Sequence, residues 1–254
     1  MTIHELHRAL EQRIPASLSC DWDNDGLAVC PDENAPVTGV LCVLDVTPAA
    51  VDLAQAKGYN VILAHHPLLF HPLRSLSAAT PVSALVRRCL LAGISVLCYH
   101  TRADAVKGGV NDCLLGALGL VPEGEPAEGQ MMRIGRLPSP FSPEAFARYA
   151  ADRLSAGAVR YAAASDRPVS LVAVCGGSGR EFLSDAIARG CDAYLSGELG
   201  HHTLSDAPMS GISVYECGHY ETERPVLSFF SDFVRSLDDT LAVETADLTP
   251  IRTL

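Results

Sequence analysis

The sequence predicts an α/β protein with two related lobes, each a mostly parallel or mixed sheet flanked by helices. Short apolar, β-branched runs such as 61–64 have no polar alternation, which is typical of strands buried on both faces. Ala-rich helical segments alternate with these runs, as in βαβ units. One helix–glycine–strand unit also occurs twice, as AQAKGYNVILAHH (54–66) and AIARGCDAYLSGE (186–198). The two copies indicate two lobes of the same construction.

Helices and strands are expected to alternate along most of the chain. In each repeated unit, the glycine predicts a helix end in the left-handed region, followed by a buried strand. Ser142 followed by Pro143 predicts a helix start, because proline is favoured in the first turn. The expected helices are 2–12, 48–57, 81–92, 108–118, 180–189 and 220–236, with one more beginning at Ser142-Pro143. The expected strands are 26–30, 37–45, 60–64, 94–99, 131–137, 159–164, 169–175, 192–196 and 212–216.

The segment VPEGEPAEG (121–129) is rich in Pro, Glu and Gly, which predicts a linker or an exposed loop. It is the expected domain boundary. We therefore expect a first lobe of residues 1–122 plus 211–254 and a second lobe of residues 130–210.

The composition and net charge limit the classes of function that the protein can have. The 254 residues are 48% hydrophobic and 19% charged, which is typical of a well-packed globular protein. The net charge of −11 argues against nucleic acid and membranes as partners, but it allows a small anionic substrate at a local cationic centre. The N-terminal residues lack the apolar core of a signal peptide, and every apolar stretch is too short to span a bilayer, so we expect a cytoplasmic protein.

The nine cysteines form no C-x-x-C pair, since no two lie closer than nine positions apart. This spacing excludes the common zinc-ribbon and redox motifs. Cys42, Cys98 and Cys175 lie within apolar strand-like runs, and we interpret them as small hydrophobic residues.

Histidines and carboxylates follow three of the predicted strands. The residues are His65 and His66 after strand 60–64, His100 and Asp104 after strand 94–99, and His219 and Glu223 after strand 212–216. In open α/β sheets, ligands bind beyond the carboxyl ends of the strands. We therefore expect these side chains to meet at one edge of the first lobe's sheet.

Their spacing favours a metal site. His219 and Glu223 are four residues apart, which places both on one face of a helix. His65 and His66 are adjacent on an extended backbone and project in opposite directions, toward two ions or toward one ion and a substrate. With Asp104, the set has too many ligands for a single catalytic zinc and suits two cations about 3.5–4 Å apart. Taken singly, Asp104 also fits a turn or helix-cap acid.

Imidazole with carboxylate fits Zn, Mn, Fe, Ni or Co, so the expected cofactors are two divalent metal ions per chain. Two such ions, two carboxylates and a bridging hydroxide leave a net charge of roughly +1, which attracts phosphate or carboxylate. We expect the hydroxide to attack an electrophilic carbon or phosphorus. His100 is the candidate catalytic residue, as an orienting group or a proton shuttle. Glu198, the counterpart of His66 in the internal repeat, is interpreted as structural.

Five blocks of the sequence match one known family. They are DWDNDGL (21–27), DVTPAAVDLAQAKGYNVILAHHPLLF (45–70), HTRADAVKGGVND (100–112), CGGSGREFLSDAIARGCDAYLSGE (175–198) and ECGHYETER (216–224). Together they resemble the signature blocks of the GTP cyclohydrolase 1 type 2 family, also called the NGG-interacting-factor-three-like or dinuclear-metal-centre hexameric family. The resemblance implies a short-form, two-lobed protein in a ring-shaped homohexamer, with a dinuclear metal site facing the inner cavity.

Carried over by position, the family's metal ligands fall on His65, His66, Asp104, His219 and Glu223, and His100 matches a histidine close to the metals. The sequence departs from the family pattern in two places. Arg102-Ala103 stands where Asn-Leu or Pro-Leu is common, and Asp25 stands where an apolar residue is usual. Neither departure removes a ligand, and Arg102 is a candidate to alter the mouth of the site and with it the substrate.

The resemblance implies hydrolytic opening of the imidazole ring of GTP, breakdown of damaged nucleotides or phosphoester hydrolysis. The resulting prediction is a dinuclear-metal-dependent hydrolase that acts on nucleotides. One alternative is a non-catalytic protein that binds, delivers or senses divalent metal. A second is a phosphodiesterase acting on nucleic acid fragments, against which the net charge of −11 argues.

Overall fold

The computed structural model describes residues 1–77 and 80–251, and the chain divides into two compact units. The first unit consists of Met1–Ala103 and Leu227–Pro250, and the second is built mainly from Asp104–Val226. The expected domain boundaries, near 122–130 and 211, are therefore wrong. Residues 104–122 and 211–226 belong to the second unit because the strands they contain, β5 (Val121–Pro122) and β10 (Ser213–Glu216), hydrogen-bond within its sheet.

The first unit contains a five-stranded sheet in the order β1-β4-β3-β2-β11. Its strands are β1 (Gly26–Val29), β2 (Val40–Val43), β3 (Val61–Ala64), β4 (Ser95–Cys98) and β11 (Val243–Thr245). All neighbours are parallel except β1 and β4. The last residue of β3, Ala64, pairs with the last residue of β4, Cys98. The chain therefore leaves these two strands at the same level of one sheet edge.

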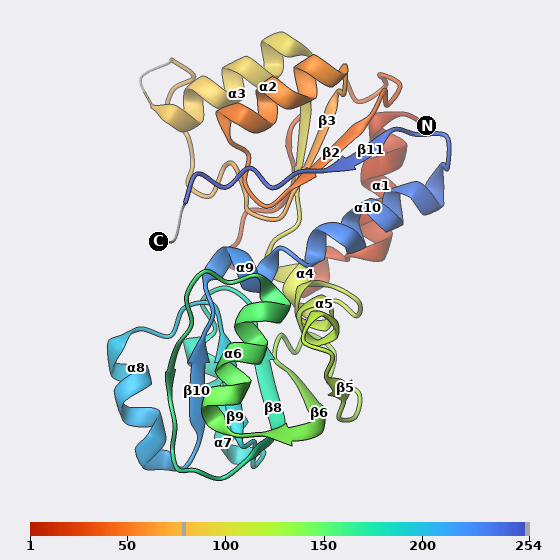
Figure 1. The fold of residues 1–254 in the computed structure, drawn as a ribbon. Helices are drawn as coiled ribbons and strands as arrows, with labels where there is room; N and C mark the ends of the chain where they lie inside the picture. Colours follow the sequence, from red (N-terminus) through yellow and green to blue (C-terminus); the bar gives the residue numbers. More distant parts are fainter. Residues whose placement is uncertain (78–79, 252–254) are drawn as a thin grey trace. The chain divides into compact units, whose positions relative to one another are not determined.

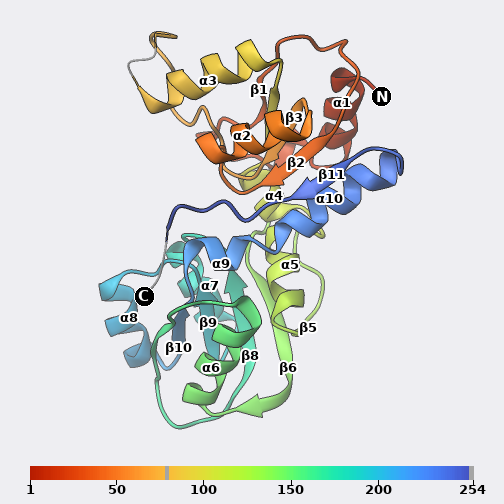
Figure 2. The ribbon, with the colours of Figure 1, turned by 45° about the horizontal axis from the view of Figure 1, so that its top comes forward.

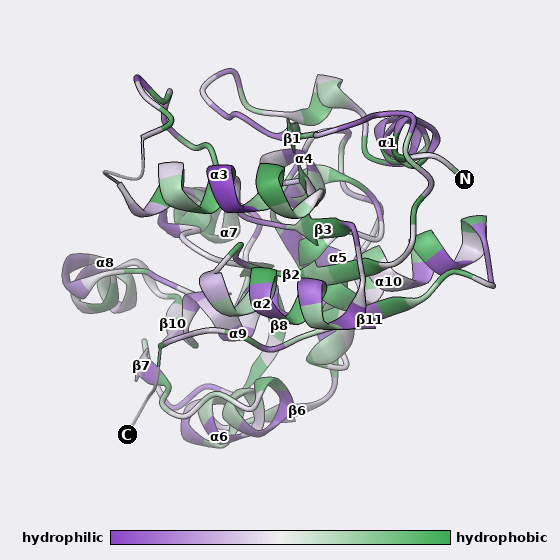
Figure 3. Cartoon of the chain, turned by 90° about the horizontal axis from the view of Figure 1, so that it is seen from above, coloured by the Kyte–Doolittle hydropathy of each residue, from purple (hydrophilic) through white to green (hydrophobic). Residues whose placement is uncertain are grey.

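Helices α2 (Pro48–Lys57) and α3 (Pro81–Ala92) cover one face of this sheet (Figure 1). They pack on strand residues such as Leu41, Ile62 and Val96 to form its core, and Figure 3 shows β3 coloured as hydrophobic. Helices α1 (Ile3–Arg13) and α10 (Val226–Leu237) lie side by side. A short 3-10 turn, η1 (Ala16–Leu18), follows α1. The parallel strands are thus buried, as their unbroken apolar sequences predict.

The second unit contains a six-stranded mixed sheet in the order β5-β6-β8-β9-β10-β7. Besides β5 and β10, its strands are β6 (Arg133–Phe141), β7 (Arg160–Ala162), β8 (Val169–Cys175) and β9 (Ala193–Ser196). The three central strands β8, β9 and β10 are parallel, and the outer pairings are antiparallel. Their carboxyl ends therefore share one edge of this second sheet.

Helices cover both faces of the second sheet. On one face, α5 (Val110–Ala117) and α6 (Pro143–Leu154) pack on Val172 and Val174, and α6 is seen against the sheet in Figure 2. On the other face, α7 (Leu183–Ala188) and α8 (His201–Asp206) lie in the cluster of Ala173 and Cys175. The short 3-10 turns η2 (Arg180–Phe182) and η3 (Ala207–Ser210) flank these two helices. Two α/β lobes, each with a mixed sheet, are confirmed.

The internal repeat corresponds to equivalent parts of the two units. Gly58 ends α2 with φ of 71° and leads into β3, and Gly190 follows α7 with φ of 68° and leads into β9. Gly93 and Gly211 stand in the same way before β4 and β10, again with positive φ. These glycines are favoured because residues with a Cβ are strained in the left-handed region.

Several local expectations differ from the structure. The helix expected over 220–236 is two helices, α9 (His219–Glu223) and α10, because Pro225 has no N–H to donate and disfavours a helical residue before it. Segment 121–129 is not a linker between domains, since it begins with an edge strand paired to β6. Strand β11 and helices α4 (Thr101–Ala105) and α8 were not predicted. Within the described residues, no helix combines the length and apolar character needed to cross a membrane.

The cysteines in the strands behave as predicted. Cys42 and Cys98 have no exposed surface, and Cys175 is 4% exposed. Burial raises the pKa of the Cys42 and Cys98 thiols to about 12, which keeps them protonated at neutral pH.

Candidate metal centre

His65 and His66 follow β3 directly and are both fixed through Nδ1. Nδ1 of His65 lies 2.9 Å from the carbonyl oxygen of Tyr99, and Nδ1 of His66 lies 2.9 Å from Oδ1 of Asp45. A carbonyl oxygen only accepts hydrogen bonds, so Nδ1 of His65 carries the proton and Nε2 carries the lone pair. This is the arrangement in which histidine ligates metal in proteins, with the second ring nitrogen held by a carbonyl or carboxylate.

His100 follows β4 and is held in the same way. Its Nδ1 lies 3.0 Å from Oδ1 of Asp23, whose other oxygen accepts hydrogen bonds from the backbone N–H and the hydroxyl of Thr101. Burial by itself would raise the pKa of Asp23, but the hydrogen bonds from His100 and Thr101 outweigh it and hold the pKa well below its usual value. Asp23 is therefore a permanent anion that orients the ring of His100.

The three histidines of the first unit form one group. His65, His66 and His100 each offer a ring nitrogen, and these nitrogens lie within 4.8 Å of one another. Two nitrogens bound to one ion at about 2.1 Å each are at most about 4.2 Å apart, so small movements suffice to bring such a group to a metal. Their donor chemistry, neutral imidazole with orienting acceptors, fits divalent transition metals.

The second unit contributes His219 and Glu223, the ends of α9. Nε2 of His219 lies 3.2 Å from Oε2 of Glu223, which confirms that the i, i+4 pair shares one helix face. On its other side, Nδ1 of His219 lies 3.2 Å from Oε1 of Glu198, two residues after the end of β9. Glu198 therefore contacts Nδ1 of His219 as Asp45 contacts Nδ1 of His66, although in the internal repeat it is the counterpart of His66 itself. Glu198 is more than the structural residue that we expected.

Asp104 belongs to the second unit and lies near Glu223, with a carboxylate oxygen of each within 4.8 Å. Asn111 supports this part of the unit from α5. Its Nδ2 donates to the backbone oxygen of Asp104, and its Oδ1 accepts from the N–H of Gly176 at 2.7 Å. The buried side chain of Asn111 thus ties the Asp104 helix to the loop after β8.

The Gly176-Gly177 loop passes directly beside Glu223. A Cβ added to Gly177 would lie 2.1 Å from Oε1 of Glu223, and the φ of Gly177 is +59°. The N–H of Gly177 donates to Oγ1 of Thr222 at 3.1 Å, which holds the loop at α9. Only glycine allows this close approach of backbone to carboxylate.

The expected single sheet edge is wrong. His65, His66 and His100 follow β3 and β4 of the first sheet, whereas His219 follows β10, which pairs with β9 and β7 in the second sheet. A strand of only four residues can pair in either sheet, and its sequence does not specify which. The motif GISV occurs at 93–96 and again at 211–214, and its two copies lead into β4 and β10, which hold equivalent positions in the two lobes. The candidate ligands thus follow strands of two different sheets.

The side chain of Arg102 is buried among charged and aromatic partners of the first unit. Its side chain is 2% exposed, its Nε donates to Oδ2 of Asp25 at 3.0 Å, and its guanidinium lies 4.5 Å from the ring centroid of Tyr99. Glu11 and the carbonyl oxygen of Ile14 accept its remaining hydrogen bonds. The two departures from the family pattern, Asp25 and Arg102, are therefore ion-pair partners inside the first unit.

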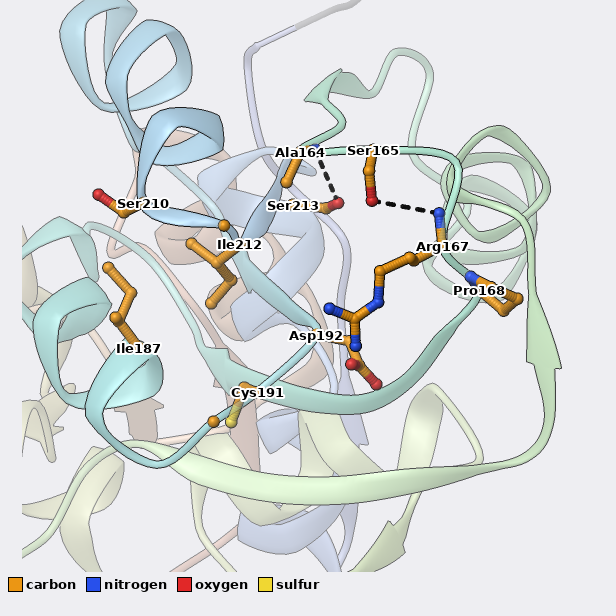
Figure 4. Close-up of a pocket in the computed structure, with 12 residues that line it drawn as sticks. Ala164, Ser165, Arg167, Pro168, Ile187, Cys191, Asp192, Ser210, Ile212 and Ser213 are labelled. Atoms are coloured by element: carbon orange, nitrogen blue, oxygen red, sulfur yellow. Dashed lines mark hydrogen bonds between the residues drawn. The ribbon is translucent and has the colours of Figure 1, made fainter.

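A cavity of about 240 Å³ lies elsewhere in the second unit. Its lining includes Asp192 and Ser213, at the amino ends of β9 and β10, together with Arg167 (Figure 4). His219 and Glu198 follow the carboxyl ends of the same strands. The cavity is therefore at the opposite end of the sheet and is not part of the candidate metal centre.

The orienting residues Asp45 and Asp23 were missed from the sequence. Asp45 lies 21 positions from His66, and Asp23 lies 77 positions from His100. The available signal was indirect, because Asp45 is the last residue of the expected strand 37–45 and both residues fall within the family-like blocks. Spacing alone could not assign them to a particular histidine.

Comparison with known proteins agrees with this construction. The model of the family Duf34/NIF3 (NGG1p interacting factor 3) matches residues 1–250. A Lactococcus lactis protein named GTP cyclohydrolase 1 type 2 homolog is 31% identical over 243 residues, which cover 94% of this chain and 93% of the relative. A protein of the same name from Streptomyces coelicolor is 33% identical over 235 residues, with 88% and 82% covered.

Solved structures share the fold. A hypothetical protein of Staphylococcus aureus superposes with a TM-score of 0.90 at 25% identity, covering 100% of this chain and 99% of the other. A Bacillus cereus protein related to NIF3 gives a TM-score of 0.89 at 23% identity, with 100% and 99% covered. The family match spans nearly the whole sequence, and the chain therefore belongs to the Duf34/NIF3 (NGG1p interacting factor 3) family.

Proposed function

We propose that the protein is a dinuclear-metal-dependent hydrolase that acts on nucleotides. The ligands would be His65 and His66 of the first unit with Asp104, His219 and Glu223 of the second, binding two divalent ions per chain. One observation carries the proposal: all four histidines near these positions have Nδ1 within 2.9–3.2 Å of an oxygen acceptor. That pattern leaves Nε2 free to act as the ligand atom in His65, His66 and His219, and it is typical of metal-binding histidines.

When bound, the ions would supply a water activated near neutral pH and stabilise negative charge that develops on the substrate. The chain's own residues have separate tasks. Asp45 and Glu198 fix the rings of His66 and His219. His100, held on Nδ1 by Asp23, presents Nε2 as a base that can accept and return a proton. Names of relatives that refer to GTP cyclohydrolase support a nucleotide as the substrate.

The decisive experiment measures metal and turnover together. Wild type, Asp104→Ala and the control Asp152→Ala, an exposed aspartate on α6 of the same unit, are purified without chelator and analysed for metal per chain. Each is then incubated with GTP, oxidised nucleotides and a generic phosphodiester. The proposal predicts about two ions and nucleotide hydrolysis in wild type and Asp152→Ala, with both reduced in Asp104→Ala.

Two other outcomes would replace this function. Two exchangeable ions without turnover of any substrate would identify a metal-binding or delivery protein. Hydrolysis of the phosphodiester with no action on nucleotides would identify a phosphodiesterase.

We also propose that the chain assembles with itself into a homohexamer, as the resemblance to the family implies. Light scattering coupled to size-exclusion chromatography should then give six times the chain mass of 27.0 kDa. A monomer or dimer at micromolar concentration would contradict this assembly.

A further inference from the structure

An exposed aromatic pair lies beside the histidine group of the first unit. Trp22 is 62% exposed and Phe70 is 43% exposed, although large apolar side chains are usually buried. Their ring centroids are 6.1 Å apart, with the planes inclined by 67°. Both rings also contact His100, with centroid distances of 6.1 Å from Trp22 and 6.3 Å from Phe70. The exposed aromatic surface is thus continuous with a member of the proposed metal centre.

The backbone around Trp22 is held in place. Cys20 donates its N–H to Oγ1 of Thr101 at 3.0 Å, and the side chain of Asn24 donates to the carbonyl oxygen of Leu69. Asp23 receives the hydrogen bonds of His100 and Thr101 described above. The exposed indole therefore projects from a loop that is fixed on both sides, and the loop is tied to the one that carries Phe70. Preorganised aromatic rings lose little conformational entropy on binding a ligand.

We propose that Trp22 and Phe70 form a stacking site for a planar heteroaromatic ring, the base of a purine nucleotide, next to His100. This inference rests on the proposed function and names the part of the substrate that the protein recognises. Base stacking on exposed aromatic side chains is a common mode of nucleotide recognition, and it tolerates different bases because each has a π face. The cationic centre would hold the anionic part of the same molecule.

The size of the patch favours a small ligand over a protein partner. Asp21, Asn24 and His71 are exposed neighbours of the two rings, so polar groups border the apolar surface. A stable protein interface buries about 800 Å² on each partner, whereas two aromatic side chains offer a few hundred at most. One planar ring matches the surface that is present.

The experiment uses the fluorescence of Trp22, which is the only tryptophan of the chain. Metal-loaded wild type is titrated with GMP, guanosine and ribose 5-phosphate. Stacking predicts saturable quenching by GMP and guanosine and none by ribose 5-phosphate, which has no base. Absence of quenching by both purine ligands overturns the proposal. Emission that shifts with protein concentration in the absence of ligand also overturns it, because the pair would then contact a second copy.

A second test of the stacking site uses variants, whose binding of GMP is measured by calorimetry. Trp22→Ala and Phe70→Ala should each raise the dissociation constant for GMP by about 5- to 150-fold, which corresponds to about 1–3 kcal/mol of stacking at 1.4 kcal/mol per factor of ten. Trp22→Phe should retain most of the affinity. Leu91→Ala, which removes an exposed side chain from α3, is the matched control and should bind as wild type. Thermal melts establish that each variant is folded.

The outcomes separate this inference from the proposed function. Quenching by GMP in wild type together with weaker GMP binding by Trp22→Ala, without turnover in wild type, supports the stacking site and rejects the hydrolase. Turnover with the same KM in wild type, Trp22→Ala and Phe70→Ala supports the hydrolase and overturns the stacking site.

Discussion

Replacing Gly177 by alanine tests the placement of Glu223 in the second unit. The φ of Gly177 is +59°, and an added Cβ would lie 2.1 Å from Oε1 of Glu223 and 3.2 Å from Nε2 of His219. The carboxylate of Glu223 is buried and would have to move, which would break its 3.2 Å contact with His219. Gly177→Ala should therefore disturb both the fold and the metal ligands.

Gly190 provides the matched control. It has a similar φ of +68° in the same unit, but an added Cβ meets no atom within 4 Å. Gly190→Ala should cost about 1 kcal/mol for the left-handed conformation alone. Gly177→Ala should cost this amount plus about 1–3 kcal/mol for the overpacked contact. The difference between the two variants isolates the steric effect from the backbone strain.

Urea denaturation measures both free energies of unfolding, and metal titration measures the affinity of each folded variant. We expect Gly177→Ala to bind metal at least about tenfold more weakly than Gly190→Ala, because a ligand and its neighbour are displaced. Equal stability and equal metal affinity in the two variants would refute the reasoning. They would show that Glu223 does not lie against the Gly177 backbone in solution.

Three further predictions concern other contacts. Arg102→Met should lower the free energy of unfolding by about 3–5 kcal/mol, because it leaves the carboxylate of Asp25 buried without its cation. In a double-mutant cycle measured by denaturation, adding Asp25→Leu to Arg102→Met should recover part of this loss. If the losses of the two single variants simply add in the double variant, the two side chains are not coupled. Asp45→Asn should weaken metal binding by about 10- to 100-fold through the ring of His66, measured by competition with a chelator, and unchanged affinity would exclude that role. Glu216 accepts hydrogen bonds from two backbone N–H groups and from Arg160, and these outweigh the effect of burial and lower its pKa below 4.5. The contribution of the ionised Glu216 carboxylate to the free energy of unfolding is therefore present above about pH 4.5 and is lost as the pH falls through the lower folded pKa. The difference in free energy of unfolding between wild type and Glu216→Gln should shrink as the pH falls, and a constant difference would contradict this.

The sequence determined the local features on which the site depends. Unbroken apolar runs specify buried parallel strands, and glycines such as Gly58 and Gly190 specify the helix ends before them. The i, i+4 spacing of His219 and Glu223 is sufficient to place both on one helix face. These features are predictable because they arise from interactions between residues close in the chain. The family-like blocks indicated the same five ligands that the spacing of histidines and carboxylates had predicted.

The tertiary structure decided which strands share a sheet and which acids orient which histidines. Strand β10 pairs in the second sheet, although its sequence is equally suited to the first, because pairing depends on hydrogen bonds with distant strands. Asp23, Asp45 and Glu198 acquire their roles only when folding brings them to the Nδ1 atoms of distant histidines. Arg102 and Asp25, which are 77 positions apart, likewise become partners only in the folded unit. Periodicity and spacing describe neighbours along the chain, whereas these contacts depend on the long-range packing of the whole unit.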